Sequence, residues 1–366
     1  MKIVIRAGGV GTRLWPWSRS SRPKQFLPFF EDRSCVQVVY DRFAGSDIVE
    51  AEDVYLSINR DTYELARAQL PELPEDNIIV EPATRDTAAA IGLETVWVAA
   101  NNPDETIASL GSDHYCGKPE NLLRALEAAD HFLDQNPGYL MAIACKPTRV
   151  ETNYGHVKMG EKLWDEDHVP VHVAEEFTEK PNWPTAKRYM ESGDYLWNAN
   201  FFAWKAGTLL DQFKEFEPEM HQTLMELADA RGGAHFHDML EEKYPTIKKT
   251  AVDYAILEPA SRKDRLAVMP VDMEWSDIGS WSTLTDAFQP DEQGNLFQGP
   301  VKQEDTTDTT VVVKNPDRKV VAVLGLEDIA VVDTEDALLV CRKDEAAKVK
   351  KLVQDMGDSD DLNELV

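Results

Sequence analysis

Strands and helices alternate through about residue 285 of this 366-residue chain, and the alternation restricts the fold more than any other feature. Short apolar runs predict strands at 2–5, 53–58, 77–81, 105–113, 139–145 and 172–180. Helical patterns lie between them at 61–70, 87–101 and 119–135. This rhythm predicts an α/β domain with a mostly parallel sheet, in which ligands bind at the carboxyl ends of the strands.

After about residue 290 the pattern changes. Closely spaced β-rich pieces follow at 309–315, 319–326, 328–334 and 337–342, which indicates a small second domain of turns or a short β-helix. Residues 344–356 predict a closing amphipathic helix, with Ala346, Val349, Val353 and Met356 on one face. We therefore expect a catalytic domain over 1–287, a β-helix-like domain over 288–356 and a frayed acidic tail over 357–366.

The charge of the chain limits its partners. The net charge of −28 argues against binding to nucleic acid polymers or to an anionic membrane surface, because both need a basic footprint. The first thirty residues, however, hold six basic side chains and no acidic one: Lys2, Arg6, Arg13, Arg19, Arg22 and Lys24. This segment is either a chance cluster in solvent or a pocket for a small anion such as one nucleotide.

The compartment also follows from the sequence. No uncharged apolar run approaches the ~18 residues of a membrane span, and the first residues lack a secretory apolar region. The four cysteines are widely spaced, without a C-x-x-C pair, so we expect reduced thiols and no disulfide or zinc site. We expect a cytoplasmic protein.

A glycine-rich loop, AGGVGTR, follows the first predicted strand. Gly8, Gly9 and Gly11 allow backbone N–H groups to approach an anion closely, and Arg13 and Lys24 supply mobile cations. The dinucleotide fingerprint fails at Leu14, and no Walker A motif can be matched. The pattern favours phosphate binding; the alternative is a tight turn that binds nothing.

Two aspartates far apart in the chain are candidate metal ligands. Asp113 closes a predicted strand in LGSDHY, and Asp277 lies in EWSDIGSW. Mg²⁺ takes a few carboxylates together with water and substrate phosphates, so two aspartates beside a phosphate loop would suit it. The alternative is that Asp113 caps the next segment and Asp277 forms an Asx-turn or N-cap.

A third set of polar residues lies within apolar or aromatic stretches of the sequence. Its members are Asn153 and Gly155 in TNYGHV, Glu179 and Lys180 in FTEKP, and Asn198 and Asn200 in YLWNANFFAWKA. Carboxylate and amide groups pair with hydroxyls, and apolar planes pack on ring faces, so this combination suits a sugar site. The alternatives are a core strand and an exposed turn.

These segments, together with EPATRDTAAAI and VDYAILE, give the chain a resemblance to the sugar-1-phosphate nucleotidyltransferase family. It looks most similar to the branch that acts on mannose 1-phosphate. The resemblance implies a Rossmann-like nucleotidyltransferase domain and a small left-handed β-helix. It also implies transfer of a guanylyl group from GTP to α-D-mannose 1-phosphate, which gives GDP-mannose and pyrophosphate, with Mg²⁺ or another divalent cation. We further expect a homodimer.

The resemblance also implies roles for individual residues. The nucleotide would be bound by Ala7, Gly8, Gly9, Gly11, Thr12, Arg13, Lys24, Glu81, Arg85, Asp86, Thr87 and Ser112. The sugar phosphate would be bound by Asn153, Gly155, Glu179, Lys180, Asn198 and Asn200. The catalytic groups would be Arg13, Lys24, Asp113, Lys180 and Asp277, with the metal held by Asp113 and Asp277.

Two departures from the family pattern and two rival functions remain. Arg6 stands where many relatives have leucine, and Asp86 and Ala89 depart from the usual string RNTAPAI. The chain ends where longer relatives continue into an isomerase domain, so we expect that second activity to be absent. The rivals are a nucleotidyltransferase for another sugar 1-phosphate or NTP, and a non-catalytic regulatory subunit that binds nucleotide sugars.

Overall fold

The computed structural model describes the whole chain except residues 10, 30–31, 100–101, 167 and 315–319. Its contacts divide it into two compact units. Unit 1 comprises Met1–Gly8, Val39–Ser112 and Lys118–Met273, and unit 2 comprises Gly9–Val38, Asp113–Gly117 and Glu274–Val366. Both units are therefore assembled from segments that lie far apart in the sequence. Parts of three predicted elements, at 100–101, 315 and 319, lie outside the described residues.

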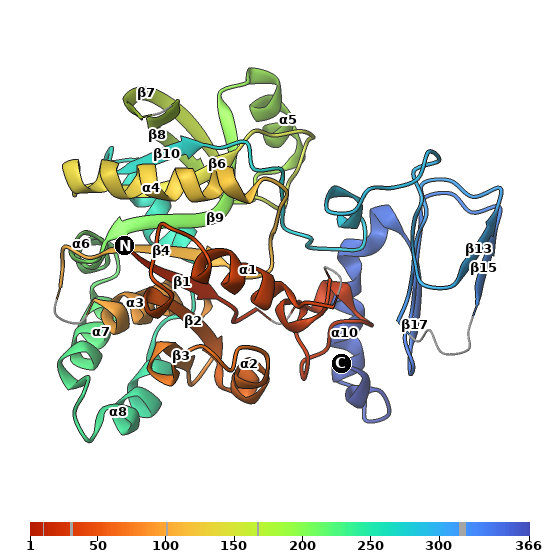
Figure 1. The fold of residues 1–366 in the computed structure, drawn as a ribbon, viewed down its shortest axis with the longest axis horizontal. Coiled ribbons are helices and arrows are strands. Elements are labelled where there is room, and N and C mark those ends of the chain that lie inside the picture. Colours follow the sequence, from red (N-terminus) through yellow and green to blue (C-terminus); the bar gives the residue numbers. More distant parts are fainter. Residues whose placement is uncertain (10, 30–31, 100–101, 167, 315–319) are drawn as a thin grey trace. The chain divides into compact units, whose positions relative to one another are not determined.

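Unit 1 is built on a nine-stranded mixed sheet with the order β3-β2-β1-β4-β9-β6-β10-β8-β7 (Figure 1). The strands are β1 Lys2–Arg6, β2 Val54–Asn59, β3 Ile78–Glu81, β4 Thr106–Gly111, β6 Leu140–Cys145, β7 His156–Glu166, β8 Val169–Thr178, β9 Tyr195–Lys205 and β10 Leu266–Pro270. Strands β1 to β4 are parallel to one another, and β9 runs antiparallel to both β4 and β6. The predicted Rossmann-like α/β fold is confirmed.

Helices cover this sheet. They are α2 Tyr63–Gln69, α3 Asp86–Val98, α4 Pro119–Gln135, α5 Trp183–Ser192, α6 Ala206–Phe216, α7 Pro218–Ala230, α8 Phe236–Lys243, the π-helical turn η7 Asp253–Leu257 and α9 Glu258–Ser261; α1, Cys35–Ala44, contains the boundary at Val38. Helix α4 has the predicted bounds and buries Leu122, Leu126 and Ala129, because these residues recur at helical spacing on one face. Strands β4 and β6 are buried along their whole length, which explains their continuous apolar sequence.

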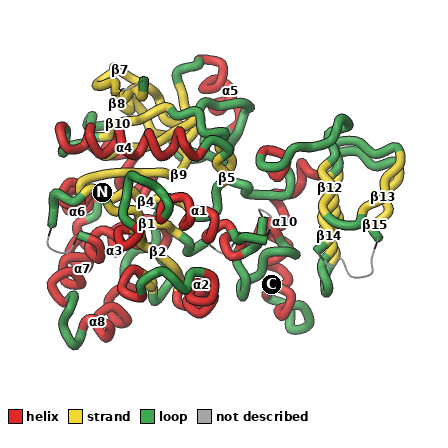
Figure 2. Tube along the Cα trace, viewed as in Figure 1, coloured by secondary structure: helices red, strands yellow, loops and turns green. Residues whose placement is uncertain are grey.

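Unit 2 combines the N-terminal loop region with short strands of the C-terminal part (Figure 2). Its elements are the 3₁₀ turns η1 Thr12–Leu14, η2 Lys24–Phe26, η8 Leu284–Asp286, η9 Lys343–Lys348 and η10 Asn363–Leu365, helix α10 Val349–Gly357, and strands β5 Tyr115–Cys116, β11 Trp275–Ser276, β12 Leu296–Gln298, β13 Val301–Glu304, β14 Thr310–Val313, β15 Val321–Leu324, β16 Ile329–Asp333 and β17 Leu338–Arg342. Strands β12, β14 and β16 stack in parallel, as do β13 and β15. This stacking confirms the predicted β-helix-like domain.

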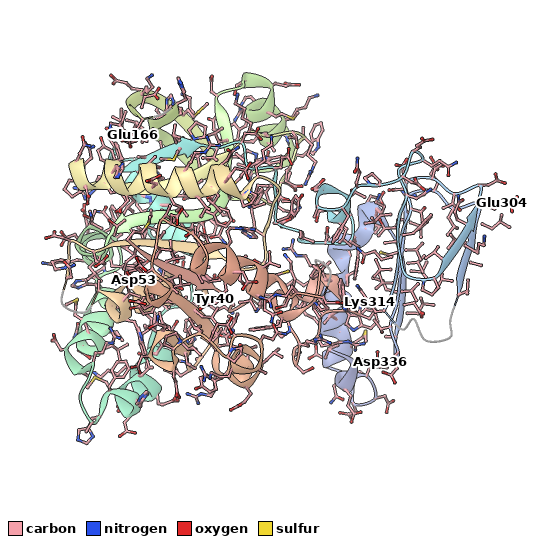
Figure 3. All side chains as sticks on the ribbon, in the orientation of Figure 1. Tyr40, Asp53, Glu166, Glu304, Lys314 and Asp336 are labelled. Atoms are coloured by element: carbon pink, nitrogen blue, oxygen red, sulfur yellow. The ribbon has the colours of Figure 1, made fainter. Side chains whose placement is uncertain are left out.

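An aromatic cluster ties the N-terminal loop to the strands of unit 2. Trp17 packs against Phe29 and stacks on Trp281. The Nζ atom of Lys314, labelled in Figure 3, lies 3.6 Å from the centre of the Trp17 ring, and burial lowers the pKa of this lysine to about 8. The predicted closing helix is 3₁₀ at its start and α-helical only from Val349.

The last residues of the chain are docked and not frayed as we expected. The indole Nε1 of Trp15 donates to the main-chain oxygen of Leu365 at 2.6 Å, and Arg19 donates to the same oxygen. Leu365 and Val366 pack against the core of unit 2. The acidic residues of this segment predicted exposure to solvent, but its apolar end supplies the contact. No helix in the described part of the chain is both long and apolar enough to cross a membrane.

Candidate active site

Two glycines of the loop, Gly9 and Gly11, lie in unit 2, and Gly11 packs against Lys24. Gly11 has φ +68, and a Cβ atom there would lie only 2.6 Å from the Cβ of Lys24. The Ser18 hydroxyl donates to the main-chain oxygen of Gly11 at 2.6 Å, and the Gln25 amide donates to that of Gly9 at 2.8 Å. Glycine is needed at Gly11 both for the left-handed backbone and for this close approach.

Lys24 joins the two aspartates that the sequence predicted as partners. Its side chain is 3% exposed, and Nζ donates to Asp113 Oδ2 at 3.0 Å and to the main-chain oxygen of Asp277. Desolvation opposes ionisation of Asp113, but the positive charge of Lys24, with His114 and the hydrogen bond, outweighs it and lowers the pKa of Asp113 to about 2. Residues 24, 113 and 277 therefore form one charged cluster.

The two carboxylates of this cluster have defined neighbours. The Trp275 indole donates to Nδ1 of His114 at 3.3 Å, so the other ring nitrogen, 3.5 Å from Asp113 Oδ1, carries the proton that faces the carboxylate. Asp277 Oδ1 accepts from the N–H of Gly279 at 2.8 Å, and a Cβ at Gly279 would strike the carboxylate. Asp277 thus makes the Asx-turn weighed as an alternative, and it does so within the cluster.

A divalent cation fits these donors only as part of a larger ligand set. Among the described residues no group of three or more His, Cys, Asp or Glu side chains is arranged to hold a metal. Mg²⁺ commonly takes one or two carboxylates and completes its octahedron with water and phosphate oxygens. The ionised Asp113 and the fixed Asp277 match that requirement, while a metal bound by protein groups alone does not.

The other N-terminal cations divide into engaged and free groups. Lys2 pairs with Asp53, and Arg19 Nη2 lies 2.7 Å from Asp336 Oδ1. Arg13 is half-buried, and no hydrogen bond or ion pair joins its guanidinium to the described residues. Of the two cations expected to meet phosphate, Lys24 is held in the acidic cluster and Arg13 is available.

In unit 1 a buried carboxyl lies at the end of β3. Glu81 is 6% exposed and accepts a hydrogen bond from the Tyr244 hydroxyl at 2.6 Å. A Cβ at Gly8 would lie 3.2 Å from Glu81 Oε1, and the main-chain oxygen of Gly8 accepts from Asn59 at 2.5 Å. Burial raises the pKa of Glu81 to about 7; the Tyr244 hydrogen bond acts against this rise, and nearby negative charges add to it.

The turn after β3 carries three further predicted residues. Arg85 Nε is buried without a hydrogen-bond partner in the described part of the chain. Asp86, with φ +68, is exposed and accepts from the N–H of Thr87 at 2.7 Å. The Thr87 hydroxyl accepts from the N–H of Val252 at 2.9 Å, so it holds two segments of unit 1 together. Arg85 alone among these three offers an unused buried donor.

Two further predicted nucleotide residues extend the sheet. The N–H of Ala7 donates to the oxygen of Ser57 at 2.7 Å, and that of Ser112 donates to the oxygen of Arg6 at 3.0 Å. These bonds continue the parallel ladders by one residue beyond β1 and β4. Ala7 and Ser112 thus lie at the carboxyl ends of neighbouring strands, where the α/β fold binds ligands.

The predicted sugar residues converge around Asn198 on β9. A Cβ at Gly155 would lie 2.7 Å from Glu179 Oε2 and 3.1 Å from Asn198 Cβ. The Asn198 amide donates to Asp253 Oδ1 at 3.0 Å, and Lys180 donates to Glu179. Four of the six predicted residues therefore meet in one place, and Asp253 joins them.

Asn153 and Asn200 have other contacts. The side chain of Asn153 is exposed and donates to Glu151 Oε1 at 2.8 Å. Asn200 Oδ1 accepts from Arg6 Nη2 at 2.7 Å. Their contacts thus serve a loop and a buried network, and neither of these two bonds joins the Asn198 group. The sequence pattern could not separate them, since amides among aromatic residues look alike before the strand is placed.

Arg6, unexplained from the sequence, anchors that buried network. It is 9% exposed and donates to the main-chain oxygen of Asn200 at 2.7 Å and to Ser109. The Ser109 hydroxyl donates to Glu94 at 2.6 Å, and Glu94 is 1% exposed. Arg6 is therefore linked to Glu94 through Ser109; burial raises the pKa of Glu94, and the positive charge of Arg6 acts against that rise.

The fold and these groups define a class: an α/β nucleotide-binding transferase with a β-helix-like domain, whose unit 2 places a lysine and two aspartates beside part of the glycine-rich loop. Comparison with known proteins then gives the family. The nucleotidyl transferase model matches residues 2–294, and a MannoseP isomerase/GMP-like beta-helix domain model matches residues 305–356. The chain belongs to the nucleotidyl transferase family and is a transferase that groups with the mannose-1-phosphate guanylyltransferases.

Individual relatives support this grouping. The chain is 33% identical over 354 residues to a mannose-1-phosphate guanylyltransferase of Klebsiella pneumoniae and 32% identical to one of Escherichia coli, covering 96% of this chain and 73% of each relative. A crystal structure of mannose-1-phosphate geranyltransferase from Thermus thermophilus superposes with a TM-score of 0.84 at 32% identity, covering 97% of this chain and 98% of that one.

Proposed function

We propose that the protein transfers the guanylyl group of GTP to α-D-mannose 1-phosphate, giving GDP-mannose and pyrophosphate. The observation that carries the proposal is the convergence of Lys24, Asp113 and Asp277 around the glycine loop. A buried lysine with two aspartates suits a phosphoryl centre, where charge and not covalent chemistry limits the rate. The names of the relatives supply the sugar and the base.

The chemistry requires no protein nucleophile. An oxygen of the sugar phosphate attacks the α-phosphorus of GTP, a new P–O bond forms, and the bond from the α-phosphorus to the bridging oxygen breaks as pyrophosphate leaves. The attacking oxygen is already anionic, so no side chain has to remove a proton. The barrier comes from bringing two polyanions together, and Arg13 and Lys24 reduce that repulsion.

In this proposal Asp113 and Asp277 hold a divalent cation, most simply Mg²⁺. When bound, the ion supplies positive charge to the phosphate oxygens during transfer. The protein's own contribution is to keep Asp113 ionised through Lys24 and to orient it through His114. Lys24 must then share Asp113 with the ion or turn toward substrate phosphate.

The base and the sugar are assigned to groups of unit 1. Glu81 would accept the N1–H and N2–H₂ of guanine, and Arg85 would donate to an acceptor on the same base. Glu179 and Asn198 would meet sugar hydroxyls, with Lys180 on the sugar phosphate. We assign no contact with the sugar to Asn153 and Asn200, because their side chains are hydrogen-bonded to Glu151 and Arg6.

The test is pyrophosphate release measured across a matrix of the four NTPs and several sugar 1-phosphates with Mg²⁺. We expect release with GTP and mannose 1-phosphate above every other pair. Release with a different pair only would replace the substrates and keep the reaction class. Binding of GDP-mannose without turnover of any pair would show a regulatory subunit instead. A cytoplasmic location and a homodimer stay predictions.

A further inference from the structure

The VDYAILE segment forms an unusual turn that the proposed chemistry has not used. Residues Asp253–Leu257 are π-helical and continue directly into α9. Single π-helical turns are rare and occur frequently at functional sites. Within the turn the side chain of Asp253 is 9% exposed, whereas the following residue, Tyr254, is 52% exposed. A carboxyl is thus held inside unit 1 by an irregular element.

The orientation of Asp253 is fixed through Asn198. The Asn198 Oδ1 accepts from the main-chain N–H of Asn200 at 3.0 Å, so its NH₂ group must face Asp253 Oδ1, 3.0 Å away. The main-chain N–H of Asn198 donates to Gly155 at 2.8 Å. Among the described side chains only Asn198 donates to the Asp253 carboxyl, a main-chain N–H adds one hydrogen bond, and the two oxygens keep lone pairs for a further donor.

A second carboxyl shares this place. The side chain of Glu179 is 7% exposed, and its Oε2 lies so close to Gly155 that a Cβ there would be 2.7 Å away. Asn198 lies next to both carboxyls: it donates to Asp253, and a Cβ at Gly155 would lie 3.1 Å from the Cβ of Asn198. Burial and the negative charge of Glu179 raise the pKa of Asp253 to about 7, and Lys180 and Arg6 act against the rise.

Asp253 is therefore protonated in part of the population near neutral pH. A neutral carboxyl can donate one hydrogen bond and accept others, whereas a carboxylate only accepts. Each sugar hydroxyl both donates and accepts, so a protonated Asp253 beside Glu179 can donate to one hydroxyl and accept from another. Two ionised carboxylates could accept from the hydroxyls but could not donate to them.

We infer that Asp253 is a specificity-determining residue, which together with Glu179 binds neighbouring hydroxyl groups of the sugar 1-phosphate. The inference rests on the proposed function and deepens it by naming the group that reads the sugar ring. The enzyme would discriminate between sugars because one that lacks or misplaces the hydroxyl leaves a buried carboxyl without a hydrogen-bond partner. An unpaired buried carboxyl costs binding free energy.

The experiment compares wild type with Asp253→Ala and Asp253→Asn, using GTP with mannose 1-phosphate and its monodeoxy analogues. We expect Asp253→Ala to raise the KM for mannose 1-phosphate about 10- to 100-fold and the KM for GTP less than about 2-fold. Asp253→Asn should give a smaller rise, because its amide still donates. Glu175→Gln, whose side chain pairs with Lys158 elsewhere on the sheet, serves as the matched control and should match wild type.

The analogues separate recognition from a structural role. The penalty of Asp253→Ala should largely disappear for the analogue that lacks the hydroxyl read by Asp253 and persist for the others. Equal penalties across all analogues, or an unchanged KM for mannose 1-phosphate, would overturn the inference. If Asp253→Ala does not fold, Asp253→Asn decides: its discrimination against that analogue must fall about 3-fold or more, and unchanged discrimination overturns the inference.

Failure of the inference and failure of the proposed function are distinguishable. A wild-type enzyme that does not use GTP and mannose 1-phosphate contradicts the proposed function. The same variants, tested with the sugar 1-phosphate that wild type does use and with its deoxy analogues, still test Asp253. A wild-type enzyme that does use mannose 1-phosphate, with Asp253 variants that discriminate as it does, contradicts the inference alone.

Discussion

Replacing Glu81 by glutamine should change how the stability of the protein depends on pH. Glu81 is buried beside Tyr244, and burial raises its pKa from the usual 4.5 to about 7. Between these two pH values the carboxyl of the unfolded chain is ionised while that of the folded chain keeps its proton. The unfolded state binds fewer protons there, so the free energy of unfolding falls as pH rises.

The magnitude follows from the same two values. At about 1.4 kcal/mol for each pH unit, a rise from 4.5 to about 7 is worth about 3 kcal/mol. Wild type should lose this amount from Glu81 between about pH 4.5 and pH 7, and Glu81→Gln, which cannot ionise, should not. The difference in unfolding free energy between variant and wild type should therefore grow by about 3 kcal/mol in favour of the variant.

Urea denaturation of both proteins at a series of pH values from 4.5 to 7.5 measures this difference. Asp253, whose pKa is also raised to about 7, contributes a fall of the same sign to both proteins and cancels in the comparison. Glu72→Gln, an exposed position, is the control and should track wild type. Parallel curves for wild type and Glu81→Gln would refute the assignment of a buried, protonated Glu81.

In the proposed function the same carboxyl also binds the guanine base. Guanine presents N–H donors, so it binds the ionised form of Glu81 better than the protonated form. In wild type the KM for GTP should fall as pH rises through about 7, and this trend should be absent in Glu81→Gln.

Three further predictions address the remaining parts of the site. Asp113→Ala should lower kcat/KM about 10²-fold or more in a pyrophosphate-release assay. A chelator should abolish wild-type turnover until Mg²⁺ is restored. Near-normal rates in either test would contradict the catalytic role proposed for the charged cluster. Gly11→Ala should lose activity and stability because its Cβ would strike the neighbouring lysine, whereas Gly193→Ala, also at positive φ but in open space, should cost only about 1 kcal/mol in denaturation and leave turnover unchanged. Arg6→Met should destabilise the fold by about 1–3 kcal/mol because the hydrogen bonds to Ser109 and Asn200 and the positive charge near Glu94 are lost, and the double variant with Glu94→Leu should recover part of that loss. Equal denaturation midpoints for the single and double variants would contradict the coupling of Arg6 to Glu94.

Local patterns made the architecture predictable. Helix α4 begins at Pro119 and ends at Gln135 as its periodicity indicated, because one apolar face and an N-terminal proline define it without help from the rest of the chain. The glycine loop and the lysine–aspartate cluster were also foreseeable. Strand ends of an α/β sheet gather at one edge, so Asp113 was expected near the loop.

Contacts between distant segments were not predictable in this way. Asp253 lies 55 residues from Asn198 in sequence, and no local pattern announces their hydrogen bond. Asn200 and Asn198 are alike in sequence, yet only the placement of Arg6 on β1 sends one amide into a buried network and leaves the other beside Gly155. The prediction of a frayed tail was wrong for a similar reason: its charge indicated exposure to solvent, and the contact with Trp15 forms only when distant segments come together.

The most direct test of the account follows the phosphorus atoms of GTP during a single turnover with mannose 1-phosphate and Mg²⁺. With label on the α-phosphate, all transferred label should appear in GDP-mannose and none in pyrophosphate. With label on the γ-phosphate, all of it should leave in pyrophosphate. Label from the γ-position on the sugar, or no labelled product from either GTP, would contradict attack at the α-phosphorus and with it the proposed function.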